Sequence, residues 1–385
     1  MFNRFYKIAV GIPAVLFLLV SSVARAASVK VSLSAGETVQ LLTDDDGDGL
    51  FEPFFIQGVG YSPVPIGRAG VQWGLTNIFD DEEILRRDFQ LLQDMHANTI
   101  RLWKADNTNN TLNEFPNYLT ARTLDLAQEY NLKVIPGFWI EMGGHWQCGD
   151  SGREFVWDES FFDLENKQVW PSVKTDILKR WRAFVTEFKD HPAILFWVIG
   201  NENNLRLGKD AALVNAFYAL VNEMAVAAHA IDVNHPVAFV NGGIEVPVVS
   251  SGEEMNAFGQ IITATSPAVD IWGVNAYPGN SFGDLFETFH EISGGKPLWI
   301  SEFGIDAWHS DREDAEGGYE DQDTQAVWAA MLWDEIAAAK DFGVIGATAM
   351  EYADEWWKPY QWMCQVPGWT QWWRPWWELD NDAGE

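Results

Sequence analysis

Two glutamates follow apolar segments of the kind that form buried strands. Glu202 comes directly after Ile194–Gly200 and Asn201, and Glu302 directly after Leu298–Ser301. In glycoside hydrolysis, one carboxyl group protonates the leaving oxygen while a second attacks the anomeric carbon or activates water. Two carboxylates held at strand ends that face each other would therefore supply the chemistry of a glycosidase.

A structural role is the competing interpretation of these glutamates, because carboxylates at loop starts also pair with lysine or arginine. The dipeptide Asn-Glu alone carries little information, since it recurs at residues 113–114 and 222–223. Only Asn201-Glu202 directly follows a seven-residue apolar strand. The occurrence of two such strand ends, 100 residues apart and in this order, favours the catalytic interpretation.

Eight short apolar runs alternate with longer helical patterns from residue 57 onward. The predicted strands are Gln57–Ser62, Thr99–Trp103, Lys133–Trp139, Ala193–Gly200, Val237–Asn241, Ile271–Asn275, Leu298–Glu302 and Val344–Glu351. The predicted helices between them are Asp81–Met95, Leu119–Tyr130, Val173–Lys189, Asp210–Ile231, Glu253–Thr263, Phe282–Ile292 and Asp323–Phe342. Such spacing is typical of repeated βα units with parallel strands, and eight units close into a (β/α)₈ TIM barrel of the α/β class.

An open, doubly wound sheet is the alternative architecture. It normally carries a glycine-rich phosphate loop after its first strand, but the segment Gly58–Pro63 lacks the third glycine and opens no helix. In a TIM barrel, functional residues gather at the C-terminal ends of the strands. We therefore expect Glu202 and Glu302, which end the fourth and seventh strands, to face each other across the barrel mouth.

Five strand-end segments resemble those of the retaining β-glycosidases whose catalytic glutamates follow strands four and seven. They are Gly58–Tyr61, Asn98–Arg101, Gly200–Glu202, Gly273–Tyr277 and Ser301–Gly304. Within that clan the barrel resembles the catalytic domains of glycoside hydrolase family 2 and the β-1,3-glucanosyltransferases of family 72. The resemblance covers about residues 58–357.

The resemblance implies a role for each matching residue. Glu302 would be the nucleophile and Glu202 the acid/base, while Asn201 would bind the sugar 2-hydroxyl and Arg101 and Tyr277 would position the nucleophile. We expect Arg101 and Tyr277 to keep Glu302 ionised, and the charge of Glu302 to keep Glu202 protonated before the first step. Carboxyl groups about 5–5.5 Å apart and retention of anomeric configuration are then expected.

Three departures from the related families stand out. Asn275 occupies a position where cellulase-like family 5 members usually carry histidine. We expect no β-sandwich domains ahead of the barrel, unlike in typical family 2 enzymes, and the cysteine pattern of family 72 is not reproduced.

Tryptophan is unusually frequent, at 21 of 385 residues. Because sugars present C–H faces that stack on indole rings, part of this excess is expected to bind glycan. Either Trp356 or Trp357, which follow the eighth strand, is expected to form the platform at the cleavage point. The other candidates are Trp103 and Trp146, expected to extend the cleft, with Asp106, Glu141 and His145 as secondary candidates on the same face. The alternative is that most tryptophans, those of Trp369–Trp377 above all, pack at the barrel end.

Composition and the N-terminus restrict partners and compartment. A net charge of −31 disfavours nucleic acid and anionic membrane surfaces and favours a neutral glycan. Residues 1–26 are typical of a secretory signal, with a basic start, an apolar run over residues 8–20 and a small-x-small cleavage site at 24–26. The run is too short for a membrane anchor. We expect a β extension over residues 27–56, a catalytic barrel over 57–385 and a periplasmic or secreted location.

Two features bear on stabilising bonds and metals. Cys148 and Cys364 either form one disulfide in an oxidising compartment or remain buried thiols. Asp44, Asp46 and Asp48, with Glu52 nearby, start like a calcium loop, but Phe55 stands at the twelfth position, and a solvated turn is the alternative. The seven histidines show no spacing typical of zinc sites, and no cofactor is expected.

The sequence therefore predicts an exported retaining β-glycosidase that acts on a neutral glycan, a β-glucan in the first place, with β-1,3 linkage as one option. Hydrolysis and transglycosylation share the same covalent intermediate and both stay open. The alternatives are an exo-acting enzyme of the β-mannosidase, β-galactosidase or β-glucuronidase type, and a non-catalytic barrel that binds glycans.

Overall fold

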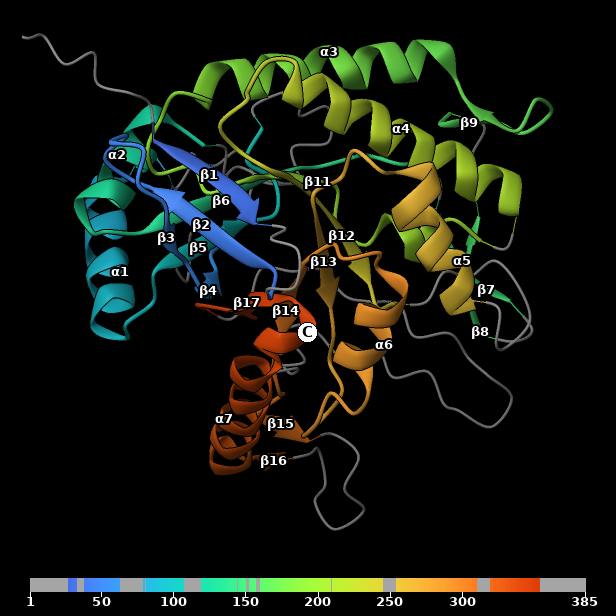
Figure 1. Ribbon diagram of the computed structural model, residues 1–385. Helices are drawn as coiled ribbons and strands as arrows, with labels where there is room; N and C mark the ends of the chain where they lie inside the picture. Colours follow the sequence, from blue (N-terminus) through green and yellow to red (C-terminus); the bar gives the residue numbers. More distant parts are fainter. Residues whose placement is uncertain are drawn as a thin grey trace, which may run out of the picture.

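The fold is a closed barrel of eight parallel strands, in the order β11-β12-β13-β14-β17-β4-β5-β6 (Figure 1). The computed structural model describes residues 27–32, 38–62, 79, 81–106, 119–143, 145–149, 152–156, 160–208, 210–244, 254–309 and 319–353. The barrel strands are β4 (Ile56–Gly60), β5 (Thr99–Leu102), β6 (Lys133–Phe138), β11 (Trp197–Ile199), β12 (Val237–Gly242), β13 (Ile271–Asn275), β14 (Leu298–Phe303) and β17 (Val344–Ala349). The predicted TIM barrel is confirmed.

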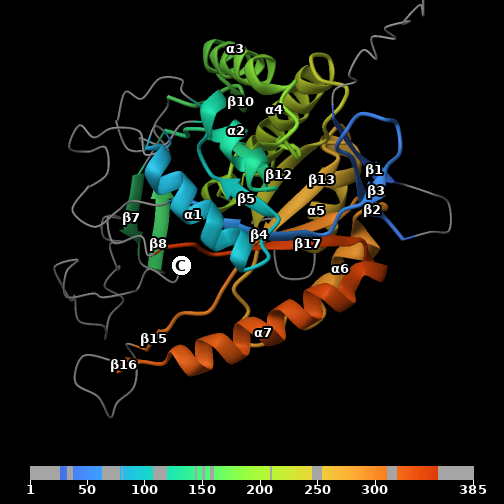
Figure 2. The same ribbon diagram turned by 90° about the vertical axis from the view of Figure 1, so that its left-hand side faces the viewer.

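Helices follow most of the strands and cover the outside of the barrel. They are α1 (Glu82–Asp94), α2 (Ala121–Glu129), α3 (Pro171–Phe188), α4 (Ala211–His229), α5 (Glu254–Gln260), α6 (Leu285–Ile292) and α7 (Gln322–Ala338). Local capping explains several starts; the Asp210 carboxylate, for example, accepts hydrogen bonds from the first-turn amides of α4. Figures 1 and 2 show α3 and α4 packed side by side.

Side chains alternate between the inside and the outside of the barrel, as the pleat of a strand requires. In β11, Val198 points into the barrel and packs with Ile135 and Trp299. Its neighbours Trp197 and Ile199 belong instead to the larger core between the barrel and the helices. This two-sided burial explains why the strands appear in the sequence as continuous apolar runs.

Helix α4 is also apolar enough to cross a membrane by length and composition, with a mean hydropathy of 1.4 over its window. However, 56% of that window is buried inside the protein, where it packs on α3 and on β12. We therefore interpret α4 as a core helix of the barrel.

The predicted N-terminal β extension forms a three-stranded antiparallel sheet of β1 (Ser28–Ser32), β2 (Gln40–Asp44) and β3 (Glu52–Pro53). Val29 and Leu41 pack on the apolar residues inside the barrel. The Val29 amide also donates to the carbonyl of Asn234, which precedes β12, at 2.7 Å. The sheet thus closes the N-terminal end of the barrel.

Three short hairpins lie in the connections between the barrel elements and were not predicted. They pair β7 (His145–Gly149) with β8 (Gly152–Val156), β9 (Phe162–Asp163) with β10 (Gln168–Val169), and β15 (Trp308–His309) with β16 (Tyr319–Glu320). Figure 2 shows β7–β8 and β15–β16 on the side of the barrel opposite the N-terminal sheet.

The barrel closes where β17 pairs with β4, and a glycine makes this seam possible. Gly346 is paired with Ile56 and has a φ of 125°. A Cβ atom at Gly346 would lie 2.3 Å from the carbonyl oxygen of Ile56 and 2.4 Å from its amide nitrogen. Both the backbone conformation and the space therefore require glycine here.

We predict that Gly346→Ala lowers the free energy of unfolding by about 3 kcal/mol or more, because it adds a clash with backbone to a strained φ. Gly279→Ala is the control: Gly279 also has a positive φ, but nothing lies within 4 Å of its added Cβ. It should cost only about 1–2 kcal/mol. Urea unfolding of both variants measures the difference, and equal losses would contradict the argument.

Candidate active site

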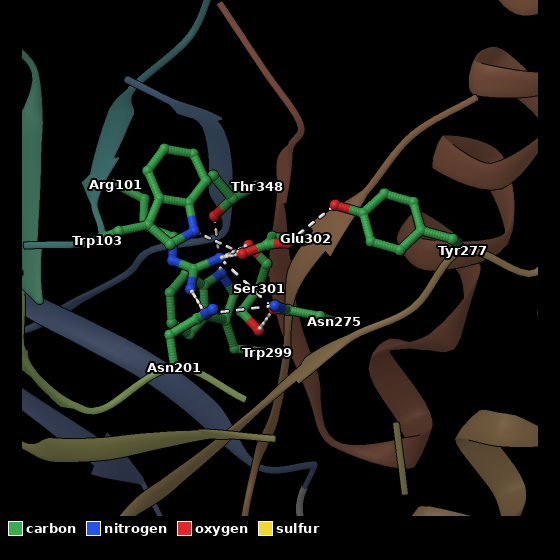
Figure 3. Close-up of polar contacts among 9 residues, drawn as sticks. All are labelled: Arg101, Trp103, Asn201, Asn275, Tyr277, Trp299, Ser301, Glu302 and Thr348. Atoms are coloured by element: carbon green, nitrogen blue, oxygen red, sulfur yellow. Dashed lines mark hydrogen bonds and ion pairs between the residues drawn. The ribbon is translucent and has the colours of Figure 1, made fainter. Parts of the chain in front are cut away.

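Glu302 lies on β14 at the C-terminal end of the barrel and is 6% exposed. Its Oε1 accepts hydrogen bonds from Arg101 Nη1 at 2.7 Å and from Trp103 Nε1 at 2.6 Å. Its Oε2 accepts a hydrogen bond from the Tyr277 hydroxyl at 2.8 Å (Figure 3). Charge-assisted hydrogen bonds of this kind are short and strong. Three donors from two other barrel strand ends thus hold the carboxylate in one orientation.

Arg101, in the middle of β5, is 1% exposed and forms the centre of this network. Besides Glu302, its Nη1 donates to the carbonyl of Ser301 at 2.7 Å, and its Nη2 donates to Asn201 Oδ1 at 2.5 Å. Its Cζ lies 5.1 Å from the ring centre of Trp103 and 5.3 Å from that of Trp299. A planar guanidinium suits such a position because it stacks on aromatic rings and donates several bonds at once.

Asn275, at the end of β13, connects the two strand ends that carry the glutamates. Its Oδ1 accepts a hydrogen bond from Ser301 Oγ at 2.7 Å, and its Nδ2 donates to Asn201 Oδ1 at 3.3 Å. The residue that departs from the family 5 pattern is therefore a full member of the network. We expect Asn275 to fix the orientation of the Asn201 side-chain amide, next to Glu202 in the sequence.

Glu202 follows β11 and adopts a left-handed backbone conformation, with a φ of 51°. Its amide donates to the carbonyl of Val240 at 3.1 Å. Burial of the Tyr277 hydroxyl raises the pKa of this phenol well above its usual value, and the charges of Glu302 and Glu202 raise it further. Of the two carboxylates, Glu302 accepts the hydrogen bond of this hydroxyl directly. A left-handed non-glycine residue is costly, and such conformations cluster at active sites.

The structure gives Trp103 a contact that the sequence did not predict, while the extension of the cleft along a glycan chain stays a prediction. Its indole N–H donates directly to Glu302. The reason is the close approach of Gly60 on the neighbouring strand β4, where a Cβ would lie 2.4 Å from the Trp103 ring. Without a side chain at Gly60, the indole lies across the strand end and reaches the carboxylate.

A second buried network was missed by sequence analysis. Asp88 of α1 is fully buried and accepts hydrogen bonds from the hydroxyls of Tyr61, at 2.9 Å, and Tyr352, at 2.8 Å. Burial and the neighbouring Asp88 raise the pKa of Tyr61 well above its usual value. The Tyr352 amide also donates to the Gly60 carbonyl. This network fixes the start of the segment after β17. In the sequence, an aspartate on the apolar face of the amphipathic helix α1 was the feature that could have indicated it.

The remaining candidates are placed as follows. Asp106 is buried and accepts a hydrogen bond from the Trp139 amide, and Glu141 accepts one from the Trp139 indole at 3.1 Å. Both are thus linked to the segment after β6. The backbone of β7 carries three further candidates, His145, Trp146 and Cys148, whose side chains lie outside the described residues. Trp356, Trp357 and Cys364 also lie outside them.

Comparison with known proteins finds a protein family whose catalytic domain this chain matches. Residues 77–333 match the TIM barrel domain of the glycosyl hydrolases family 2. The β-galactosidase large subunit of Leuconostoc lactis is 29% identical over 127 residues, which span 33% of this chain and 17% of that protein.

Two solved structures share the fold. A β-D-glucuronidase of Dictyoglomus thermophilum superposes with a TM-score of 0.54 and 19% identity, over 85% of this chain and 47% of that one. A β-glucuronidase of Bacteroides uniformis superposes with a TM-score of 0.53 and 17% identity, over 85% of this chain and 33% of that one. The chain thus covers less than half the length of each of these relatives.

We predict that Asp88→Ala lowers the free energy of unfolding by about 3 kcal/mol or more, because the buried Tyr61 hydroxyl and the half-buried Tyr352 hydroxyl lose their acceptor. The matched control is Asp94→Ala, which removes an exposed carboxylate from the same helix and should change stability by no more than about 0.5 kcal/mol. Thermal or urea unfolding provides the measurement. A loss in Asp88→Ala no larger than in the control would show that the network contributes nothing.

Proposed function

The chain belongs to family 2 of the glycosyl hydrolases, and we propose that it is an exported retaining β-glycosidase that acts on a neutral β-linked glycan. The observation that carries the proposal is the carboxylate of Glu302, held by Arg101, Trp103 and Tyr277 at the barrel mouth. A carboxylate held in one orientation by three donors is prepared for a nucleophilic role, and Glu202 follows the fourth strand of the same barrel.

In the first step, a Glu302 oxygen attacks the anomeric carbon and forms an ester bond with the sugar. The bond between that carbon and the glycosidic oxygen breaks, and the leaving oxygen takes the proton of the Glu202 carboxyl group. As the ester forms, Glu302 loses its negative charge. A second negative charge in the site is then no longer repelled by Glu302, and this favours the deprotonated form of Glu202.

In the second step, the Glu202 carboxylate takes a proton from water or from a sugar hydroxyl, and that oxygen attacks the anomeric carbon from the other side. The ester bond breaks and Glu302 leaves as a carboxylate. Two inversions give net retention. Water as acceptor gives hydrolysis, and a sugar hydroxyl gives transglycosylation.

The neighbouring residues have distinct parts in this scheme. Arg101 and Trp103 orient the oxygen Oε1, while Tyr277 donates to Oε2. The Asn201 carbonyl oxygen is occupied by Arg101 and Asn275, so the side chain presents its NH₂ group to other partners. We propose that this NH₂ group binds the sugar 2-hydroxyl, where hydrogen bonds strengthen in the transition state.

Charge and tryptophan content support a neutral glycan as substrate. With a net charge of −31, the protein repels polyanions at long range, and its many indoles offer stacking surfaces for uncharged sugars. A β-glucan is our first choice. An exo-acting β-galactosidase is the second candidate, which the partial similarity to the Leuconostoc lactis protein favours.

Azide distinguishes the two catalytic roles. On an activated aryl β-glycoside, we predict that Glu302→Ala and Glu202→Ala each lose activity on the order of 10³-fold or more. Added azide should then give an α-glycosyl azide with Glu302→Ala, because azide replaces the nucleophile. It should give a β-glycosyl azide with Glu202→Ala, because azide attacks the glycosyl ester. Proton NMR of the products reads the configuration.

The control for this experiment is Glu223→Ala, which alters another Asn-Glu dipeptide on the exposed face of α4, where Glu223 pairs with Lys174. This variant should keep full activity. The same azide configuration from both catalytic variants would show that the two roles are wrongly assigned.

The substrate is tested with the mature protein and with Glu302→Gln. Both are incubated with β-1,3-glucan, β-1,4-glucan, mannan and galactan oligosaccharides, and mass spectrometry follows product length. We predict shorter products from a β-glucan with the wild type only, since the neutral amide of the variant lacks the attacking oxygen anion. Longer products would show transglycosylation. Release of single galactose units, with no action on glucans, would favour the second candidate.

A further inference from the structure

The loop between β2 and β3 brings three carboxylates together at the N-terminal end of the barrel. One oxygen from each of Asp44, Asp46 and Asp48 lies within 4.8 Å of those of the other two. Asp46 and Asp48 are exposed, whereas Asp44 is 3% exposed. Negative charges this close repel each other unless a cation lies between them.

Asp44 supplies the observation that points to a ligand. Its Oδ2 accepts a hydrogen bond from the Gly49 amide at 3.0 Å. Its Oδ1 is buried and has no hydrogen-bond partner among the residues that the structure describes. A buried carboxylate oxygen without a donor is costly, and native proteins satisfy nearly all such atoms. A bound cation would satisfy it.

A lysine side chain beside this loop pairs with a different aspartate. Lys133 pairs with the neighbouring Asp45 at 2.8 Å, and within the described ranges no lysine, arginine or histidine pairs with the three clustered carboxylates. Backbone amides fix two of them in place, since Asp46 Oδ1 accepts from the Asp48 amide and Asp48 Oδ1 accepts from the Leu50 amide. The loop backbone itself thus positions two of the three carboxylates.

We propose that Asp44, Asp46 and Asp48 bind one Ca²⁺ ion. Calcium prefers carboxylate and carbonyl oxygens, tolerates irregular geometry and keeps water in its coordination shell, whereas Mg²⁺ demands a near-octahedral site. The alternating aspartates followed by Gly49 match the first half of a calcium loop. Because Phe55 replaces the twelfth-position glutamate, the site is not a complete EF-hand loop.

The site joins the N-terminal sheet to the barrel. Asp44 ends β2, and the adjacent Asp45 pairs with Lys133, the first residue of β6. Glu302 lies at the C-terminal end of the barrel strands, so the ion is remote from the glutamates. Calcium bound only by the folded state stabilises it, and its predicted effect is on unfolding temperature.

Isothermal titration calorimetry of CaCl₂ into EDTA-treated mature protein tests the proposal. The variants are Asp46→Asn and Asp48→Asn, whose side chains are exposed and keep an oxygen that can accept the backbone hydrogen bonds. The charge-matched control is Asp45→Asn in the same loop. We predict one Ca²⁺ per wild-type chain, similar binding by Asp45→Asn, and at least tenfold weaker binding by the other two variants. The unfolding temperature should rise with CaCl₂ in the wild type and in Asp45→Asn only.

The same titration with MgCl₂ should give at least tenfold weaker binding to the wild type. Absence of Ca²⁺ binding to the wild type at millimolar concentration would overturn the proposal. Equal binding by the wild type, Asp46→Asn and Asp48→Asn would also overturn it, because the ion would then be bound by other acidic groups. Tighter binding of Mg²⁺ than of Ca²⁺ would overturn the choice of metal.

Discussion

The buried ion pair between Arg101 and Glu302 is the interaction on which the barrel mouth depends. The guanidinium side chain is 1% exposed and the carboxylate side chain 8%. Removing two charges from water is expensive, and the attraction between them offsets the cost only where further hydrogen bonds complete the site. Here Ser301, Asn201, Trp103 and Tyr277 supply those bonds. Loss of either charge would leave the other buried and unpaired.

Closure of the barrel explains why these groups can meet. The ion pair, the amides and the phenol come from β5, β13 and β14 and from the residues after β11 and β13, which are far apart in the sequence. Strand pairing fixes the relative height of each strand end, and the apolar interior keeps the strands at fixed spacing. The Arg101 bonds of 2.7 Å therefore depend on the packing of side chains inside the barrel.

The strands were predictable because a parallel strand buried on both faces gives a continuous apolar run. Residues that end such runs, Glu202 and Glu302, were predictable for the same reason. The hydrogen bond from Trp103 to Glu302 was not predictable, because it depends on the absence of a side chain at Gly60 on another strand. Asp88 was missed because the two tyrosines that donate to it lie at distant strand ends. Pairing between distant segments leaves little trace in a single sequence.

The close approach of Gly60 to the indole of Trp103 has an evolutionary consequence. A larger residue at Gly60 would displace the indole and remove a hydrogen bond from Glu302, while a smaller residue at Trp103 would leave a gap beside the carboxylate. Each single substitution therefore disturbs the contact. A joint change restores the fit between the two positions, but it restores the bond to Glu302 only if the new residue at position 103 also donates. The two positions are thus coupled, and directed evolution of this barrel should randomise them jointly.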